Sequence, residues 1–204
     1  MVNTTQPKAM LDGQAEVLLT ALRVKSLTTY EHCLRVAEMV GDLAERMNFG
    51  EDQTRQLTTA ALLHDIGKMT IPSSILTKAD ELDPGEFYRI QGHARMGHAL
   101  LNRLHGFDEI AHIVRHHHER WDGEGYPAGL AGVEIPLASR VIHLADAVDT
   151  MLHPRSYKAA YPMEWVLGEL NRCRGGQFDP HVVDVAAAWL ERQLVAPRKL
   201  AQAA

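Results

Sequence analysis

Apolar residues recur every three or four positions along most of this 204-residue chain, and runs in which apolar and polar residues alternate are nearly absent. The first pattern is typical of amphipathic helices, and the second is typical of half-buried strands. The sequence therefore predicts an all-α protein, a helical bundle in which each helix turns one face toward a shared core. At roughly 150 residues per domain, the length favours one domain over two.

Helix boundaries are indicated by capping residues and by glycine and proline. Thr28 and Glu31 have the spacing of a capping box, and Asp83, Pro84 and Glu86 form a second helix start. The predicted helices are 8–25, 28–47, 52–64, 84–104, 108–119, 137–152, 163–172 and 180–195. The stretch WDGEGYPAGLAGVEIP is the most loop-like part of the sequence.

Composition excludes several classes of protein. With 46% hydrophobic and 23% charged residues, the chain is expected to be globular rather than disordered. No apolar run approaches the roughly 18 residues that cross a bilayer, and the N-terminus lacks the features of a signal peptide. Cys33 and Cys173 are too few for a disulfide scaffold, and we expect both to be small core residues of a cytoplasmic protein. The net charge of -5 argues against binding to a nucleic-acid duplex.

The chain contains 12 histidines, and histidine is the commonest metal ligand in proteins. Four of them share helix faces with apolar residues, namely His32, His93, His117 and His118. We expect these four side chains to point into the core. His98 and His116 continue polar lines along their helices and are expected to face solvent.

Three further polar residues interrupt apolar helical segments: His64, Asp65 and Asp146. A single inward histidine is usually a hydrogen-bonded core residue. A buried polar group without a partner costs about 1 to 3 kcal/mol, however, and an unpaired buried charge costs more. Divalent cations would satisfy all seven inward groups together and would neutralise the two aspartates. The sequence therefore predicts a metal centre between the helices of the bundle.

The ordered motifs of the chain resemble those of the HD-GYP domain family, a subgroup of the HD-superfamily metal-dependent phosphohydrolases that degrades the bacterial second messenger cyclic di-GMP. The resemblance runs from about Thr28 to Val183. It rests on the segments TTYEHCLRV, ALLHDIGKMTIPSSILTK, HHERWDGEGYPAGLAG, RSYK and GGQFDP, and on the helices around His93 and Asp146. The adjacent His-Asp pair alone would be weak evidence, since two neighbouring residues recur by chance.

The resemblance implies a dinuclear metal centre made by the same seven side chains. One ion is expected to be held by His32, His64, Asp65 and Asp146. The second ion is expected to be held by His93, His117 and His118, with Asp65 bridging both ions. Some family members bind a third metal through a glutamate four residues before the first histidine, and this position is Thr28 here. We therefore expect two ions, iron or manganese, although nickel, cobalt or zinc could occupy the site after purification.

The resemblance also implies how the substrate is bound and attacked. A hydroxide shared between the two ions is expected to attack the phosphodiester. Asp65 and Lys68 are the predicted catalytic residues, with the Lys68 ammonium stabilising the transition state at the scissile phosphate. Arg155 and Lys158 resemble the phosphate-binding pair of the family, and Tyr126 is expected to shape the rim of the site.

Other interpretations of single residues stay open. Lys68 could be a solvated lysine at a helix end, and Tyr126 could simply be packed within a turn-rich loop. Trp121 could stack on a base, although we favour a place in the core. Asp149 lies one helical turn after Asp146 and is expected to orient a ligand histidine or a water from outside the ligand set.

The predicted function is hydrolysis of cyclic di-GMP to linear pGpG, and further cleavage of pGpG to GMP stays open. Residues 1–27 are expected to form a helical extension, 28–195 the catalytic domain and 196–204 a flexible tail of either a stand-alone enzyme or a fragment. The alternatives are hydrolysis of a related dinucleotide such as cyclic GMP-AMP, hydrolysis of a smaller nucleotide, and binding of the dinucleotide or of a diguanylate cyclase with little or no turnover. The family also uses its Gly-Tyr-Pro loop to contact diguanylate cyclases, which implies a protein partner.

Overall fold

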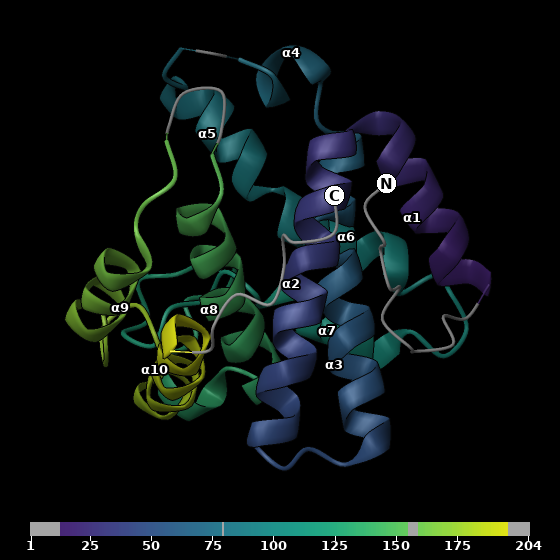
Figure 1. The fold of residues 1–204 in the computed structure, drawn as a ribbon. Helices are drawn as coiled ribbons and strands as arrows, with labels where there is room; N and C mark the ends of the chain where they lie inside the picture. Colours follow the sequence, from purple (N-terminus) through teal and green to yellow (C-terminus); the bar gives the residue numbers. More distant parts are fainter. Residues whose placement is uncertain (1–12, 79, 155–158, 196–204) are drawn as a thin grey trace, which may run out of the picture.

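The computed structural model describes residues 13–78, 80–154 and 159–195, and these residues form helices joined by turns (Figure 1). The α-helices are α1 (Gly13–Lys25), α2 (Leu27–Arg46), α3 (Glu51–Leu63), α4 (Ser73–Leu76), α5 (Pro84–Gln91), α6 (His93–Leu101), α7 (Asp108–Arg115), α8 (Leu137–Leu152), α9 (Met163–Arg172) and α10 (Pro180–Val195). Two short 3-10 helices lie between them, η1 (Ile66–Thr70) and η2 (Gly132–Glu134). The described residues form no β-strand, so the predicted all-α fold is confirmed.

Helix α2 runs through the middle of the bundle and packs against α1, α3 and α8 (Figure 1). Its inner face carries Val36, Val40 and Leu43, whose side chains are fully buried, while Glu31 and Glu38 are exposed. Helix α7 packs against α3 and α6, and α6 also packs against η1. Burial of one apolar face per helix is the arrangement that the spacing predicts.

Helix α6 approaches η1 so closely that only glycine fits between them. A Cβ atom at Gly67 would lie 2.0 Å from the carbonyl oxygen of His93 and 2.6 Å from the amide nitrogen of Gly97. Both of these atoms belong to the backbone, so they cannot move aside without shifting α6. Because Gly67 follows Asp65 by two residues, this contact holds the start of α6 beside the segment that follows α3.

Of the two helix starts predicted from capping residues, the one of α5 is confirmed and the one of α2 is not. Helix α5 begins as predicted, because the Asp83 carboxylate accepts a hydrogen bond from the Glu86 amide at 2.8 Å. The capping box predicted at Thr28 is wrong. The N-cap of α2 is Ser26, whose hydroxyl oxygen accepts a hydrogen bond from the Thr29 amide at 3.2 Å.

Two predicted helices are longer than those observed. The single helix predicted over 84–104 is divided at Gly92 into α5 and α6. Helix α7 ends at Arg115, so the three consecutive histidines that follow lie in turns rather than on the helix.

Helix α1 packs on α2, α3 and η1 and contributes Ala15, Leu19 and Leu22 to the core. Among the described helices, none is long and apolar enough to cross a membrane. Several predictions fall outside the described residues: the helix start at 8–12, the tail at 196–204, and the phosphate-binding pair Arg155 and Lys158.

Candidate metal centre

The seven predicted ligands come from separate segments of the chain. His32 lies on α2 and Asp146 on α8, while His64 and Asp65 follow directly after α3. His93 is the first residue of α6, and His117 and His118 follow α7. The packing of these helices brings all seven side chains together, as the following distances show.

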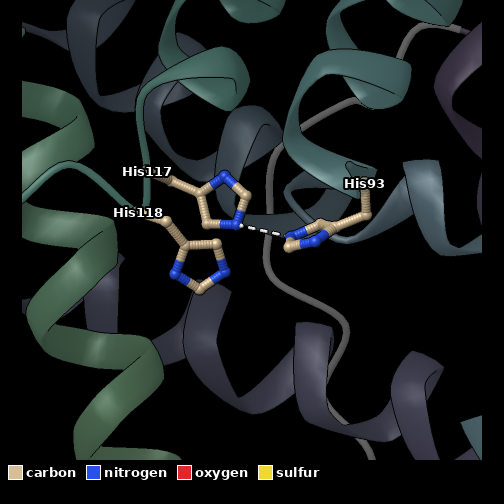
Figure 2. A group of neighbouring side chains, drawn as sticks. All are labelled: His93, His117 and His118. Carbon is tan, nitrogen blue, oxygen red and sulfur yellow. Dashed lines mark hydrogen bonds between the residues drawn. The ribbon is translucent and has the colours of Figure 1, made fainter. Parts of the chain in front are cut away.

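Two groups of three side chains each have the geometry of a metal site. In the first group, His93, His117 and His118 point toward one another (Figure 2), and their ligand atoms all lie within 4.8 Å of each other. The second group contains His32, His64 and Asp146 within the same limit. Nitrogen and carboxylate donors at this spacing can each surround one divalent cation.

Asp65 lies between the two groups, with one carboxylate oxygen toward each. Its Oδ1 is 3.4 Å from Nε2 of His93, and its Oδ2 is 3.6 Å from Nε2 of His64 and 4.0 Å from Nε2 of His32. This arrangement suits a carboxylate that bridges two cations.

Each of three histidines is fixed by its own backbone. The Nδ1 atoms of His64, His93 and His117 lie 2.7, 2.6 and 2.6 Å from the carbonyl oxygen three residues earlier. A carbonyl can only accept, so Nδ1 carries the proton and the Nε2 lone pair is directed into the cluster. A neutral imidazole with a free Nε2 is the form that binds a metal.

Burial keeps these imidazoles neutral. It lowers the pKa of His93 to about 4, and it also lowers the pKa values of His64, His117 and His118 below their usual range. Nε2 of His64 and Oδ1 of Asp65 are buried without a hydrogen-bond partner in the described part of the chain, and Nε2 of His32 faces Oδ1 of Asp146 at 3.1 Å. A buried polar atom without a hydrogen-bond partner destabilises the folded state. A cation between these atoms would satisfy them, so the residues fit a metal centre.

The aspartates are held in the ionised form. Burial alone would raise the pKa of Asp65, but the Lys68 ammonium and the neighbouring histidines lower it well below its usual range. The pKa of Asp146 is likewise lowered against the effect of burial, chiefly by His32. Charged carboxylates in a buried site require a positive partner, which divalent cations would supply.

Asp149 contacts a predicted ligand from outside the cluster. Its Oδ2 accepts a hydrogen bond from Nδ1 of His32 at 2.7 Å, and Arg35 donates to both carboxylate oxygens at 2.7 and 2.9 Å. Burial would raise the pKa of Asp149, but these hydrogen bonds lower it to about 2. The two carboxylates, Asp146 and Asp149, raise the pKa of His32 to about 9 against the effect of burial.

Of the other residues singled out from the sequence, Lys68 and Tyr126 contact predicted ligands, whereas Thr28 and Trp121 lie elsewhere. Nζ of Lys68 lies 2.6 Å from Oδ2 of Asp65, and its side chain is only 23% exposed. The ring of Tyr126 stacks on the ring of His118 with centroids 4.9 Å apart. Thr28 is exposed at the start of α2. Trp121 lies under the guanidinium of Arg140 and is half-buried.

Two orientations predicted for histidines are wrong. His116 is 6% exposed rather than solvated, because α7 ends at Arg115 and the helical spacing no longer applies to it. His98 is half-buried, and its Nδ1 lies 3.1 Å from the Ala111 carbonyl of α7. A polar line on one helix does not exclude contact with a neighbouring helix.

Three buried residues beside the cluster were not among the predicted site residues. His143 is buried with Nδ1 3.0 Å from the His117 carbonyl, and it could have been noticed because it lies one turn before Asp146. Glu119 is 1% exposed. Cys33 was expected only to fill the core, yet its thiol lies within 4.8 Å of ligand atoms of His64 and Asp65. Burial raises the pKa of this thiol, so it stays protonated.

The chain also matches a known family of protein domains. The model of the HD domain family matches residues 16–182. The chain belongs to the HD domain family. This membership accounts for the histidine and aspartate cluster, and the recognition made from the sequence motifs is confirmed.

Relatives within the HD domain family include enzymes that act on cyclic dinucleotides. The chain is 41% identical over 152 residues to the cyclic di-GMP phosphodiesterase response regulator RpfG of Xanthomonas campestris, covering 74% of this chain and 40% of the relative. It is 36% identical over 170 residues to the 3'3'-cGAMP-specific phosphodiesterase 2 of Vibrio cholerae, covering 82% of this chain and 33% of the relative. The chain thus spans less than half the length of these curated relatives.

A solved structure has the same fold. The HDG"Y"P protein Bd1817 of Bdellovibrio bacteriovorus aligns with a TM-score of 0.64 at 18% identity, over 87% of this chain and 60% of that one. At this identity the likeness shows the HD-domain fold alone.

Proposed function

We propose that this chain is a metal-dependent phosphodiesterase that hydrolyses cyclic di-GMP to linear pGpG, with further cleavage to GMP left open. The observation that carries the proposal is the pair of donor groups joined by Asp65. The names of relatives at 41% and 36% identity support the substrate class, a cyclic dinucleotide.

Two divalent ions are proposed for the centre. His32, His64 and Asp146 would hold one ion and His93, His117 and His118 the other, with Asp65 shared. Iron and manganese suit this set of imidazole and carboxylate donors, and nickel, cobalt or zinc could also bind. When bound, such a pair lowers the pKa of a water and stabilises the charge that develops on a phosphodiester.

The residues around the centre have proposed roles toward the substrate. Lys68 is proposed to bind the scissile phosphate, because its ammonium already lies at the edge of the centre against Asp65. Tyr126 is proposed to line the rim beside His118. Arg155 and Lys158 are proposed to bind the second phosphate, on the resemblance of RSYK to the family motif. Asp149 is proposed to orient His32 through the hydrogen bond to its Nδ1.

The domain limits, location and protein partner stay proposals as well. We propose 28–195 as the catalytic domain, while the family match begins further toward the N-terminus, at residue 16. A cytoplasmic location is proposed because Cys33 and Cys173 are too few for a disulfide scaffold, which fits a reducing compartment. A diguanylate cyclase partner at the Gly-Tyr-Pro loop remains a prediction from the resemblance.

The substrate 3'3'-cGAMP is a second candidate, because the Vibrio cholerae relative is named for it. One experiment tests both substrates. The protein, loaded with Mn(II) or Fe(II), is incubated with each dinucleotide, and the products are separated by chromatography. We expect conversion of cyclic di-GMP to pGpG in the wild type and loss of conversion in His64→Ala and Asp65→Ala. His105→Ala, at an exposed histidine, should keep full activity. If no metal-loaded form cleaves either dinucleotide, the proposed phosphodiesterase activity is wrong, and binding of the dinucleotide without turnover becomes the better interpretation.

A further inference from the structure

Glu119 is a fully buried carboxylate that lies directly after His118 but outside the two donor groups. Its Oε1 accepts a hydrogen bond from the Ala128 amide at 2.7 Å, and its Oε2 accepts from the Gly129 and Leu130 amides at 3.0 and 3.2 Å. Hydrogen bonds to an ionised acceptor are stronger than neutral ones. One side chain therefore holds three successive amides of the loop that contains the Gly-Tyr-Pro sequence.

The same loop folds back on the residues around Glu119. The Tyr126 amide donates to the His118 carbonyl at 3.2 Å. A Cβ at Gly125 would lie 2.3 Å from the Arg120 amide nitrogen and 2.6 Å from Cα of Glu119, so only glycine allows this approach. The result is that the Tyr126 ring lies on the ring of His118.

A residue of helix α6 also contacts the loop. Arg95 of α6 donates from Nη2 to the Pro127 carbonyl at 3.0 Å, and Arg95 is exposed. Hydrogen bonds with Glu119 and with Arg95 thus hold the segment 126–130.

We propose that Glu119 is a positioning residue that holds the segment 126–130 over His118, and that this segment selects large cyclic dinucleotides as substrates. The selection part rests on the proposed phosphodiesterase function. A small phosphodiester needs only the metal centre, whereas a ligand with two bases and two phosphates extends onto the rim. Loosening the segment therefore weakens binding of the dinucleotide and leaves cleavage of a small diester intact.

Glu119→Gln is the variant that tests this role. Gln replaces one acceptor oxygen with an NH₂ group, which cannot accept from a backbone amide, so at least one of the three hydrogen bonds is lost. The matched control is Glu124→Gln in the same loop, since the Glu124 side chain is 79% exposed and its contact with Arg120 is 3.9 Å long.

Hydrogen exchange and kinetics give separate readouts. In Glu119→Gln we expect the amides of Ala128, Gly129 and Leu130 to exchange about 10-fold faster or more, the effect of losing a charged hydrogen bond. We expect KM for cyclic di-GMP to rise by a similar factor, about 10-fold, with kcat little changed. Metal content and hydrolysis of bis(4-nitrophenyl) phosphate should match the wild type. Glu124→Gln should leave all four measurements unchanged.

Two results would overturn the proposal. Unchanged exchange at 128–130 would show that Glu119 does not hold the segment. Reduced metal content with an equal loss on both substrates would show that Glu119 supports the centre itself rather than the loop. If Glu119→Gln does not fold, Arg95→Ala loosens the same segment through its contact with Pro127, and an unaltered KM for cyclic di-GMP there would overturn the selection part of the proposal. If the wild type cleaves no dinucleotide, the proposed function fails, while the exchange result still decides what Glu119 does.

Discussion

We expect Asp149, which is not a predicted ligand, to influence the proposed metal centre through His32. It accepts the Nδ1 proton of His32 and is paired with Arg35 through both oxygens. In Asp149→Asn the charge is lost and His32 is held less firmly, so we expect metal affinity to fall by about 10- to 100-fold. Competition with a chelator measures this, and Glu38→Gln, an exposed residue of α2, the helix that carries His32, is the control. Equal affinities in wild type and Asp149→Asn would contradict the orienting role.

The lowered pKa of His93 predicts that the unfolding free energy of the metal-free protein falls in acid. Its pKa is lowered by burial from 6.5 to about 4, so the folded state binds a proton less readily than the unfolded state. This contribution to stability is complete above pH 6.5 and is lost as the pH falls toward 4. Between pH 7.5 and pH 5, we expect the wild type to lose about 2 kcal/mol more stability than His93→Gln. Urea unfolding of chelator-treated protein at the two pH values tests this, and identical losses would refute it.

Substitution of two glycines by alanine is predicted to have opposite effects on stability, because Gly67 lies in the tight contact between η1 and α6 and Gly41 lies in open space on α2. In Gly67→Ala the new Cβ meets the His93 and Gly97 backbone at 2.0 and 2.6 Å, so α6 must shift. We expect a loss of about 2 to 3 kcal/mol in unfolding free energy. Gly41→Ala in α2 meets no atom within 4 Å, and there alanine should stabilise the helix by about 0.5 to 1 kcal/mol. A Gly67→Ala protein as stable as wild type would show that this packing is looser than described.

Most helices could be predicted from the sequence because their apolar residues recur every three or four positions. Local capping fixed the start of α5 at Asp83 as well. The division between α5 and α6 could not be predicted, because the backbone of Gly92 stays in the helical region, with φ -59° and ψ -19°. His116 was placed wrongly for a related reason: its orientation depends on where α7 ends, and no strong stop signal marks Arg115.

Ligand binding across several helices should stabilise the whole molecule. Metal ions bind the folded chain and not the separated segments, so stability rises with free metal. At a free Mn(II) concentration 100 times the Kd, we expect the melting temperature to rise by about 5 to 10 °C. A thermal unfolding series in Mn(II) measures this shift. It should be lost in His64→Ala and kept in His105→Ala, and a shift of equal size in both variants would place the ions elsewhere.

The arrangement of the centre is a property of the complete fold. Helical spacing correctly turned His32 and His93 inward, because the side on which a residue lies depends only on its own helix. The place of Asp65 between two donor groups depends on how α2, α3, α6 and α8 pack, so spacing could not predict it and the family resemblance did. Glu119 was missed because its partners are backbone amides about ten residues away, which carry no sequence signal.

Anomalous scattering from crystals grown with Mn(II) tests the central claim most directly. Two peaks are predicted, one bounded by His93, His117 and His118 and the other by His32, His64 and Asp146, with Asp65 in contact with both. A map without signal between these side chains, or with a single peak that Asp65 does not touch, would contradict the dinuclear centre.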